Sequence, residues 1–590
     1  MRFSFHAGAC RCAGVLLVSA SLAASVSAAE SRQPQLRSAD AAFREGYAAE
    51  QRGDLAAAKA QFEKVARLAP DIAEGHCALG AVLRQLGQYE QAIRELVRAV
   101  ALKDDDRSAQ MNLAMAYEQS GDHEKSLSRF RSLDRNTATP LPPSVVIFYI
   151  RALAATQQTE AAIAKTQHAL AAAPENPALH DTLGSLEAQK QDWNGAVSQF
   201  KEAVRLDPNF AEAHLHLGLT LLMQQRTSEA MQELTTATEL SPLDPFAQVE
   251  LGKAMIATGE DSKAIPVLQR AVALAPASLD AKYQLALALQ TSGQEEQAIP
   301  FFQQVVTADP HNAPALTNLA LALVQMGKAK EAIPLYQRAL KEAPDDPLVY
   351  QDLGVAYLQE SDLSDAAAEF RKGLKLAPGA YELHYDLGLA LKLQDDIQVA
   401  ASELELAARL NPNSPDPPYT LGILDMQTGR FDDAAEKLRT ALKLRPENGD
   451  GWAILGSVYR QQSKQAEAID ALEKAIEMMP NQPGPHITLA GVLAQQGRTT
   501  EAAAERKKGA DLSRMAVNRQ RATFAANTGR ALLLKGQITD AIERYQEAVS
   551  SDPTYVEAHR GLAAALERAG RTAEAEVERQ KHAQLDQIQP

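Results

Sequence analysis

Large apolar, small and polar residues recur along this chain with a spacing of 34 residues. In the clearest copy, residues 449–482, small residues stand at positions 8, 20 and 27. The large residues stand at positions 4, 7, 11 and 24: Trp452, Leu455, Tyr459 and Leu472. Positions 4, 7, 8 and 11 share one face of a helix, and so do positions 20, 24, 27 and 28. Each copy therefore predicts two amphipathic helices.

The pattern can be followed through sixteen copies. Ten of them have Gly near position 15, where a left-handed residue can end the first helix at low cost. Proline near position 32 ends the second helix in most copies, as Pro480 does in the clearest one. Neither helix can bury its apolar stripe alone, so each pair must pack on the next. We therefore expect an all-α solenoid of about 16 antiparallel helix pairs.

The phase of the repeat divides the chain into three blocks. Repeats 1–3 occupy residues 39–142, and the register slips by two residues at the proline-rich stretch 139–143. Repeats 4–14 continue without interruption from 143 to 516. A shift of five residues across 513–521 precedes repeats 15 and 16, which we place with a polar C-terminal cap at 517–590.

The first residues are typical of an export signal. Arg2 and Arg11 precede an apolar stretch, and Val26-Ser27-Ala28 fits the small-x-Ala rule for cleavage. We expect residues 1–29 to be a cleaved signal peptide and residues 30–38 to be a polar linker. The alternative is an uncleaved N-terminal anchor, although a stretch of this length is short for a bilayer span.

The repeat resembles the tetratricopeptide repeat (TPR) family, from Ser38 to the end of the chain. The resemblance implies a right-handed superhelix in which the first helices line a concave face that binds peptides or protein segments. Trp is found at position 4 only in Trp452, and six other repeats have His there. Successive repeats lie too far apart for these histidines to share a metal ion, so we expect them to be structural.

Several positions that the family resemblance turns inward are apolar or acidic in the middle repeats. The apolar members predict a groove for a partner segment, or alternatively packing against the next repeat. The acidic members would attract Lys or Arg side chains. The candidate partner-binding residues are Leu215, His216, Leu219, Val249, Glu250, Tyr283, Gln284, Leu287, Asn318, Leu321, Asp352, Tyr385, Asp386, Tyr419 and Met426.

The net charge of −15 argues against a nucleic-acid surface, which needs clustered Lys and Arg. Beyond the leader there is a single cysteine, Cys77, which we expect to be a packing residue. One basic cluster lies at the second phase shift and predicts either a site for an acidic partner or lipid headgroup, or a solvated helix and loop. It consists of Arg506, Lys507, Lys508, Arg514, Arg519 and Arg521.

No segment outside the repeats is long enough for an enzyme domain, and no phosphate-binding glycine loop or nucleophile elbow is present. We therefore predict a non-enzymatic scaffold with no cofactor or metal, exported to the periplasm or secreted. Its expected partners are basic or apolar protein segments. The alternative is a periplasmic subunit of polysaccharide export or cell-envelope assembly. A failure of the signal prediction would instead suggest a cytoplasmic adaptor.

Overall fold

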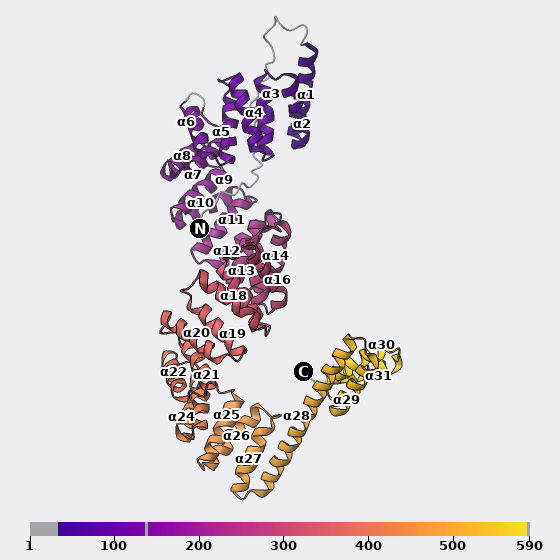
Figure 1. Cartoon of the computed structure of the whole chain (residues 1–590). Coiled ribbons are helices and arrows are strands. Elements are labelled where there is room, and N and C mark those ends of the chain that lie inside the picture. Colours follow the sequence, from indigo (N-terminus) through magenta and orange to yellow (C-terminus); the bar gives the residue numbers. More distant parts are fainter. Residues whose placement is uncertain (1–32, 136–139, 587–590) are drawn as a thin grey trace. The chain divides into compact units, whose positions relative to one another are not determined.

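The computed structural model describes residues 33–135 and 140–586, which contain 31 helices and no strand (Figure 1). The chain divides into two compact units, Met1–Pro310 and His311–Pro590. The predicted signal peptide, residues 1–29, lies outside the described residues.

The helices of the first unit are α1 (Gln33–Gln51), α2 (Leu55–Leu68), α3 (Ala73–Gln85), α4 (Tyr89–Leu102), α5 (Arg107–Gln119), α6 (His123–Asp134), α7 (Pro143–Ala155), α8 (Thr159–Ala172), α9 (Pro177–Gln189), α10 (Trp193–Leu206), α11 (Ala211–Met223), α12 (Thr227–Leu240), α13 (Pro245–Ala257), α14 (Asp261–Leu274), α15 (Leu279–Thr291) and α16 (Glu295–Ala308).

The helices of the second unit are α17 (Ala313–Gln325), α18 (Ala329–Glu342), α19 (Pro347–Gln359), α20 (Leu363–Leu376), α21 (Tyr381–Leu393), α22 (Ile397–Leu410), α23 (Asp416–Gln427), α24 (Phe431–Leu444), α25 (Gly449–Gln461), α26 (Gln465–Met478), α27 (Pro483–Gln495), α28 (Thr499–Leu534), α29 (Ile538–Ser551), α30 (Val556–Arg568) and α31 (Thr572–Asp586).

Each repeat is a pair of helices that pack against each other, and within each unit the second helix also packs on the first helix of the next repeat. Helix α28 serves both as the second helix of repeat 14 and as the first helix of repeat 15. The described residues therefore form sixteen helix pairs, as the sequence pattern predicts.

The residue at position 15, which joins the two helices of a pair, has a positive φ in all sixteen repeats. Ten of these residues are glycines, as predicted. The other six have a side chain in the left-handed region, which costs roughly 1 kcal/mol at each position. They are Gln157, Gln191, Gln225, Ser361, Asp395 and Ser463.

A close approach of the two helices explains the small residue at position 8 and the large residue at position 24. A Cβ added to Gly354 would lie 2.4 Å from Cε1 of Phe370, and one added to Gly80 would lie 2.5 Å from Cγ of Leu96. Both large side chains are fully buried. Overpacking this contact would cost about 1–3 kcal/mol.

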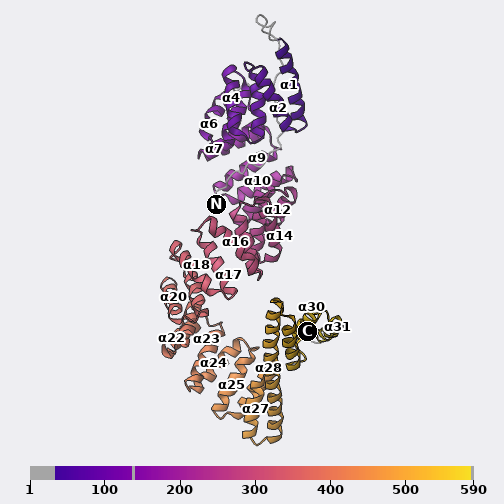
Figure 2. The same ribbon diagram turned by 45° about the vertical axis from the view of Figure 1, so that its right-hand side comes forward.

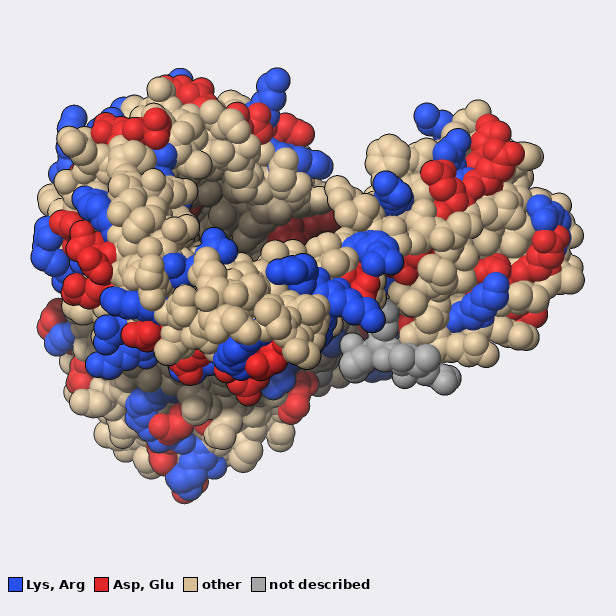
Figure 3. Space-filling view, turned by 90° about the horizontal axis from the view of Figure 1, so that it is seen from below, with Lys and Arg blue, Asp and Glu red and all other residues tan. Residues whose placement is uncertain are grey.

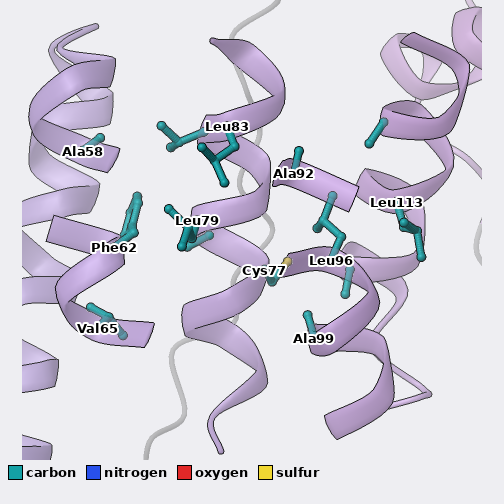
Figure 4. Packing of buried hydrophobic residues seen from close by; sticks show 14 of the residues in the cluster. Ala58, Phe62, Val65, Cys77, Leu79, Leu83, Ala92, Leu96, Ala99 and Leu113 are labelled. Carbon is teal, nitrogen blue, oxygen red and sulfur yellow. The ribbon is translucent and has the colours of Figure 1, made fainter. Parts of the chain in front are cut away.

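Buried side chains from successive helices meet between the repeats. Figure 4 shows Phe62 of α2, Leu79 of α3 and Leu96 of α4 in one such cluster. Cys77 is buried in the same cluster, and its burial raises the pKa of the thiol to about 12. The prediction that Cys77 is a packing residue is therefore confirmed, because such a thiol is not a ready nucleophile.

The structure differs from the sequence interpretation at the ends of two blocks. Helix α1 begins at Gln33, so residues 33–38 are helical rather than part of a linker. The phase shift at 513–521 contains no loop, because α28 passes through it as one helix of 36 residues (Figures 1 and 2). The five inserted residues extend the helix instead of ending it. Among the described residues, no helix combines the length and apolar character that crossing a membrane requires.

Candidate binding face

The first helices of successive repeats lie side by side. Contacts join α9 to α11 and α11 to α13 in the first unit, and α19 to α21 in the second. Among the described residues, second helices of successive repeats make no contact of similar extent. The first helices therefore form the inner wall of each unit, and the predicted partner-binding residues lie on them.

Three predicted groove residues of the first unit are core residues instead. Leu215 and Leu219 are 6% and 7% exposed and pack in one cluster with Leu251 of the next first helix. Val249 is 4% exposed and packs with Ala281. For these residues the alternative of packing against the next repeat holds, because positions 5 and 9 fill the space between neighbouring first helices.

The polar residues among the predicted partner-binding residues of the first unit already have partners within the chain. Glu250 is buried, and the Lys253 ammonium lies 2.9 Å from its carboxylate and 2.8 Å from that of Asp280. The Gln284 amide donates to Asp280 over 3.2 Å. Because these charges are already paired, they offer little to a partner. Two apolar members are half-buried: Tyr283 and Leu287.

His216 links two repeats. Its Nδ1 lies 2.7 Å from a carboxylate oxygen of Asp181 in the preceding repeat, and its ring lies 5.5 Å from that of Phe200. Burial opposes a charge on the imidazole, but the Asp181 carboxylate and, more weakly, Glu212 raise the pKa of His216 above its ordinary value. His216 is therefore held in a cross-repeat ion pair.

In the second unit the predicted partner-binding residues remain partly accessible, and hydrogen bonds between polar side chains link successive repeats. Gln351 donates to Asp386 over 2.6 Å, and the Tyr385 hydroxyl lies 3.4 Å from that of Thr420. Both bonds join position 5 of one repeat to position 6 of the next, a step of 35 residues. All seven predicted residues here are half-buried: Asn318, Leu321, Asp352, Tyr385, Asp386, Tyr419 and Met426.

Asp352 is the most perturbed carboxyl group of this row. Its burial, together with the negative charges of Asp346 and Asp386, raises its pKa to about 6. The neighbouring Tyr336 side chain is fully buried, and its hydroxyl has no hydrogen-bond partner. Burial and the charge of Asp352 both raise the pKa of Tyr336. A cation placed beside Asp352 would neutralise a carboxylate that is costly to leave unpaired.

The histidines at position 4 are structural, as predicted. In His384 the Nδ1 atom lies 2.6 Å from the carboxylate of Glu403, and Nε2 lies 3.1 Å from the carbonyl oxygen of Pro378. The first contact joins the two helices of a repeat, and the second reaches the turn that follows the preceding helix. The same pair of contacts is made by His76, His180 (to a glutamine), His214, His486 and His559.

A charge ladder in the first repeats was not predicted. Position 12 holds Glu50, Arg84 and Glu118 in repeats 1–3. Glu118 is buried, and Nε of Arg151 lies 3.2 Å from its carboxylate. The guanidinium groups of Arg84 and Arg151 both lie within 6 Å of the centre of the Phe148 ring. Burial raises the pKa of Glu118, and the nearby positive charges oppose this. The alternation of sign at 34-residue spacing was the signal that could have revealed it.

Lysine, arginine, aspartate and glutamate side chains are interspersed over the face shown in Figure 3, without a field of one sign. Within the described ranges, no group of three or more His, Cys, Asp or Glu residues is placed to hold a metal ion.

Models of the tetratricopeptide repeat family match segments across the chain. They cover residues 39–72, 77–140, 184–225, 249–313 and 529–570. The model of the C-terminal domain of cilia and flagella-associated protein 70 matches residues 303–527. The helix pairs thus pack as in a TPR solenoid. No curated protein sequence matches the chain.

Solved structures of TPR proteins are also similar over parts of the chain. MamA from Desulfovibrio magneticus RS-1 is 25% identical, with 29% of this chain and 96% of MamA covered and a TM-score of 0.28. YrrB, a TPR protein with an unusual peptide-binding site, is 22% identical, with coverages of 31% and 95% and a TM-score of 0.28. The Cut9–Hcn1 hetero-tetramer of APC/C is 16% identical, with coverages of 91% and 98% and a TM-score of 0.31.

Proposed function

We propose that this array of tetratricopeptide repeats is a binding scaffold that holds a segment of a partner protein along the first helices of its second unit. The segment places a Lys or Arg side chain at Asp352 and apolar side chains against Tyr385, Tyr419 and Met426. The function is to bring proteins together rather than to catalyse a reaction. The observation that carries the proposal is the half-buried Asp352 carboxylate, whose pKa is raised to about 6 by burial and by Asp346 and Asp386.

The chemistry of the row supports an extended or helical segment as the ligand. The aromatic and thioether side chains are half-buried, so each keeps an accessible edge for contact. Asp386 is fixed by its hydrogen bond from Gln351, which limits the entropy lost when a ligand binds. A positive side chain at Asp352 would gain a charge-assisted hydrogen bond in a partly dry setting.

A display library of random peptides, panned on the full chain, tests this function. We expect the enriched peptides to contain Lys or Arg and to lose at least tenfold in affinity for Asp352→Asn. The matched control is Glu405→Gln, which removes one charge from an exposed position on the second helix α22. Affinity should also rise from pH 5 to pH 7, because Asp352 loses its proton over that interval.

Two results would reject the proposed function. One is enrichment of peptides without positive side chains. The other is an equal loss of binding in Asp352→Asn and Glu405→Gln, since a general effect of net charge would explain that result. A display experiment with unchanged affinity in Tyr385→Ala would restrict the site to the acidic part of the row.

We further propose that the scaffold works outside the cytoplasm. The support is the sequence of residues 1–29, with positive charge, an apolar stretch and a small-x-Ala cleavage site. Sequencing the N-terminus of the protein purified from its native cells should find Glu30 or a nearby residue first. Finding Met1 would overturn cleavage, and recovery of the protein in the cytoplasmic fraction would overturn export.

A further inference from the structure

The first helix of repeat 15 exposes a face that is buried in the neighbouring repeats. In repeat 16, positions 3 and 10 are Ala558 and Ala565, and both are fully buried. In repeat 15, the same positions are Phe524 and Ala531, and both are exposed. Phe524 is 76% exposed. Leu534, one turn beyond Ala531, is 79% exposed, but it stands at position 13, which is also exposed in other repeats, for example at Leu393. The exposure of an aromatic side chain at a position that the neighbouring repeats bury indicates an interaction surface.

The second helix of the preceding repeat covers this face elsewhere. At position 3 of repeat 13, a Cβ on Gly451 would lie 2.9 Å from Leu442, which belongs to α24. Helix α29 packs on α30 in the same way. Repeat 15 has no such neighbour, because the second helix of repeat 14 and the first helix of repeat 15 are one continuous helix, α28. Two halves of one straight helix cannot pack side by side.

Repeat 14 has the features of the end of a stack. Position 24 is a fully buried Phe, Tyr or Leu in most repeats, but it is the exposed Arg506 in repeat 14. The last repeat has Arg579 at the same position, also exposed. Stacking therefore ends at repeat 14 and begins again at repeat 15, whose first face is open.

The open face lies in a segment with positive charge and no negative charge. From residue 513 to residue 536 there is no Asp or Glu, although the chain as a whole carries a net charge of −15. The exposed side chains beside Phe524 and Leu534 include Arg521, Arg530 and Lys535. Their charges favour a partner with acidic side chains flanking an apolar stripe.

We propose that the face formed by Phe524 and Ala531 binds an acidic amphipathic helix of a partner protein. This helix takes the place that the second helix of a preceding repeat holds elsewhere. A helix is the occupant that fits, since helices fill this position in the other stacked repeats. The chain's own α29, which covers repeat 16, has one Asp and two Glu against a single Arg. This site is separate from the row around Asp352 and does not depend on the function proposed for that row.

A display library of helical peptides, panned on the full chain, tests the proposal. We expect enriched peptides to be amphipathic and acidic, and to lose at least tenfold in affinity for Phe524→Ser. The double variant Arg521→Glu with Arg530→Glu should lose a similar factor. The matched control is Leu393→Ser, which alters a side chain that is 62% exposed on α21 and should leave affinity unchanged. All three variants change exposed side chains, so circular dichroism should report intact folds. Asp352→Asn should bind these peptides normally.

Three outcomes would overturn the proposal. The first is the enrichment of peptides whose binding ignores both Phe524→Ser and the charge reversals. The second is binding of the full chain to vesicles of phosphatidylglycerol and phosphatidylethanolamine that Phe524→Ser abolishes, which would make the face a membrane contact. The third is a dimer in sedimentation velocity that Phe524→Ser dissociates, which would make a second copy of the chain the occupant.

Discussion

The buried hydroxyl group of Tyr336 is a defect that a single substitution should repair. The side chain is fully buried between α18 and its neighbours, and the hydroxyl has no hydrogen-bond partner. Phe370 fills the same position in the next repeat without a hydroxyl. We therefore expect Tyr336→Phe to stabilise the repeats around it.

The size of the effect follows from two opposing contributions. Burial of a hydroxyl without a partner costs about 1–3 kcal/mol, and Tyr336→Phe removes that cost. The space of one oxygen atom is left behind, roughly 10 Å³, which costs only about 0.2 kcal/mol at ~24 cal/mol per Å³. The net expectation is a gain of about 1–2 kcal/mol in the free energy of local unfolding.

Native-state hydrogen exchange is the suitable assay, because repeat arrays do not unfold as one unit. Amides of α17 to α19 should exchange about five- to thirtyfold more slowly in Tyr336→Phe, since 1.4 kcal/mol corresponds to a factor of ten. The converse variant, Phe370→Tyr, should speed exchange in α19 and α20. Faster exchange in Tyr336→Phe would refute the reasoning and would mean that the hydroxyl is satisfied, for example by a bound water molecule.

Three further changes test the same physical account. The pKa of Asp352 is raised from 3.8 to about 6 in the folded protein, so the folded state holds the proton more tightly and its stability falls as pH rises through that interval. Asp352→Asn should therefore raise the free energy of local unfolding around α19, measured by native-state hydrogen exchange, by about 1–2 kcal/mol at pH 7.5 and by much less at pH 4. An equal gain at both pH values would contradict this. Ser361→Gly should stabilise the repeat that contains it by about 0.5–1 kcal/mol in the same assay, because Ser361 has a φ of 62°. A loss of stability would show that the Ser361 side chain makes a needed contact. Gly354→Ala should lower the melting temperature through an overpacking cost of about 1–3 kcal/mol against Phe370, and an unchanged melting temperature would mean that the two helices can move apart.

The repeat architecture could be predicted from the sequence because it depends on local chemistry. The spacing of large and small residues determines which face of each helix is apolar, and position 15 determines where the chain turns. All sixteen left-handed turns are found where the period places them. The structural role of the histidines at position 4 followed from geometry as well, although their partners at position 23 did not.

How far each predicted partner-binding residue is buried depends on packing between repeats. Leu215 and Tyr385 both stand at position 5, yet Leu215 is core and Tyr385 keeps an accessible edge. The difference comes from the neighbouring first helices, whose side chains lie 34 or 35 residues away. Periodicity within one repeat cannot report how much of a side chain the next repeat covers.

The phase shift after repeat 14 is the clearest case in which tertiary structure decided the result. The sequence alone determined only that the register changes there, and a solvated helix and loop was one interpretation of the segment. In the structure the insertion is helical, so α28 carries the chain past the place where the next pair would stack. The exposed Phe524 follows from that continuity. Local sequence determined the helices of this protein, and the contacts between them determined which of their faces remain open, because burial is a property of neighbours rather than of a residue.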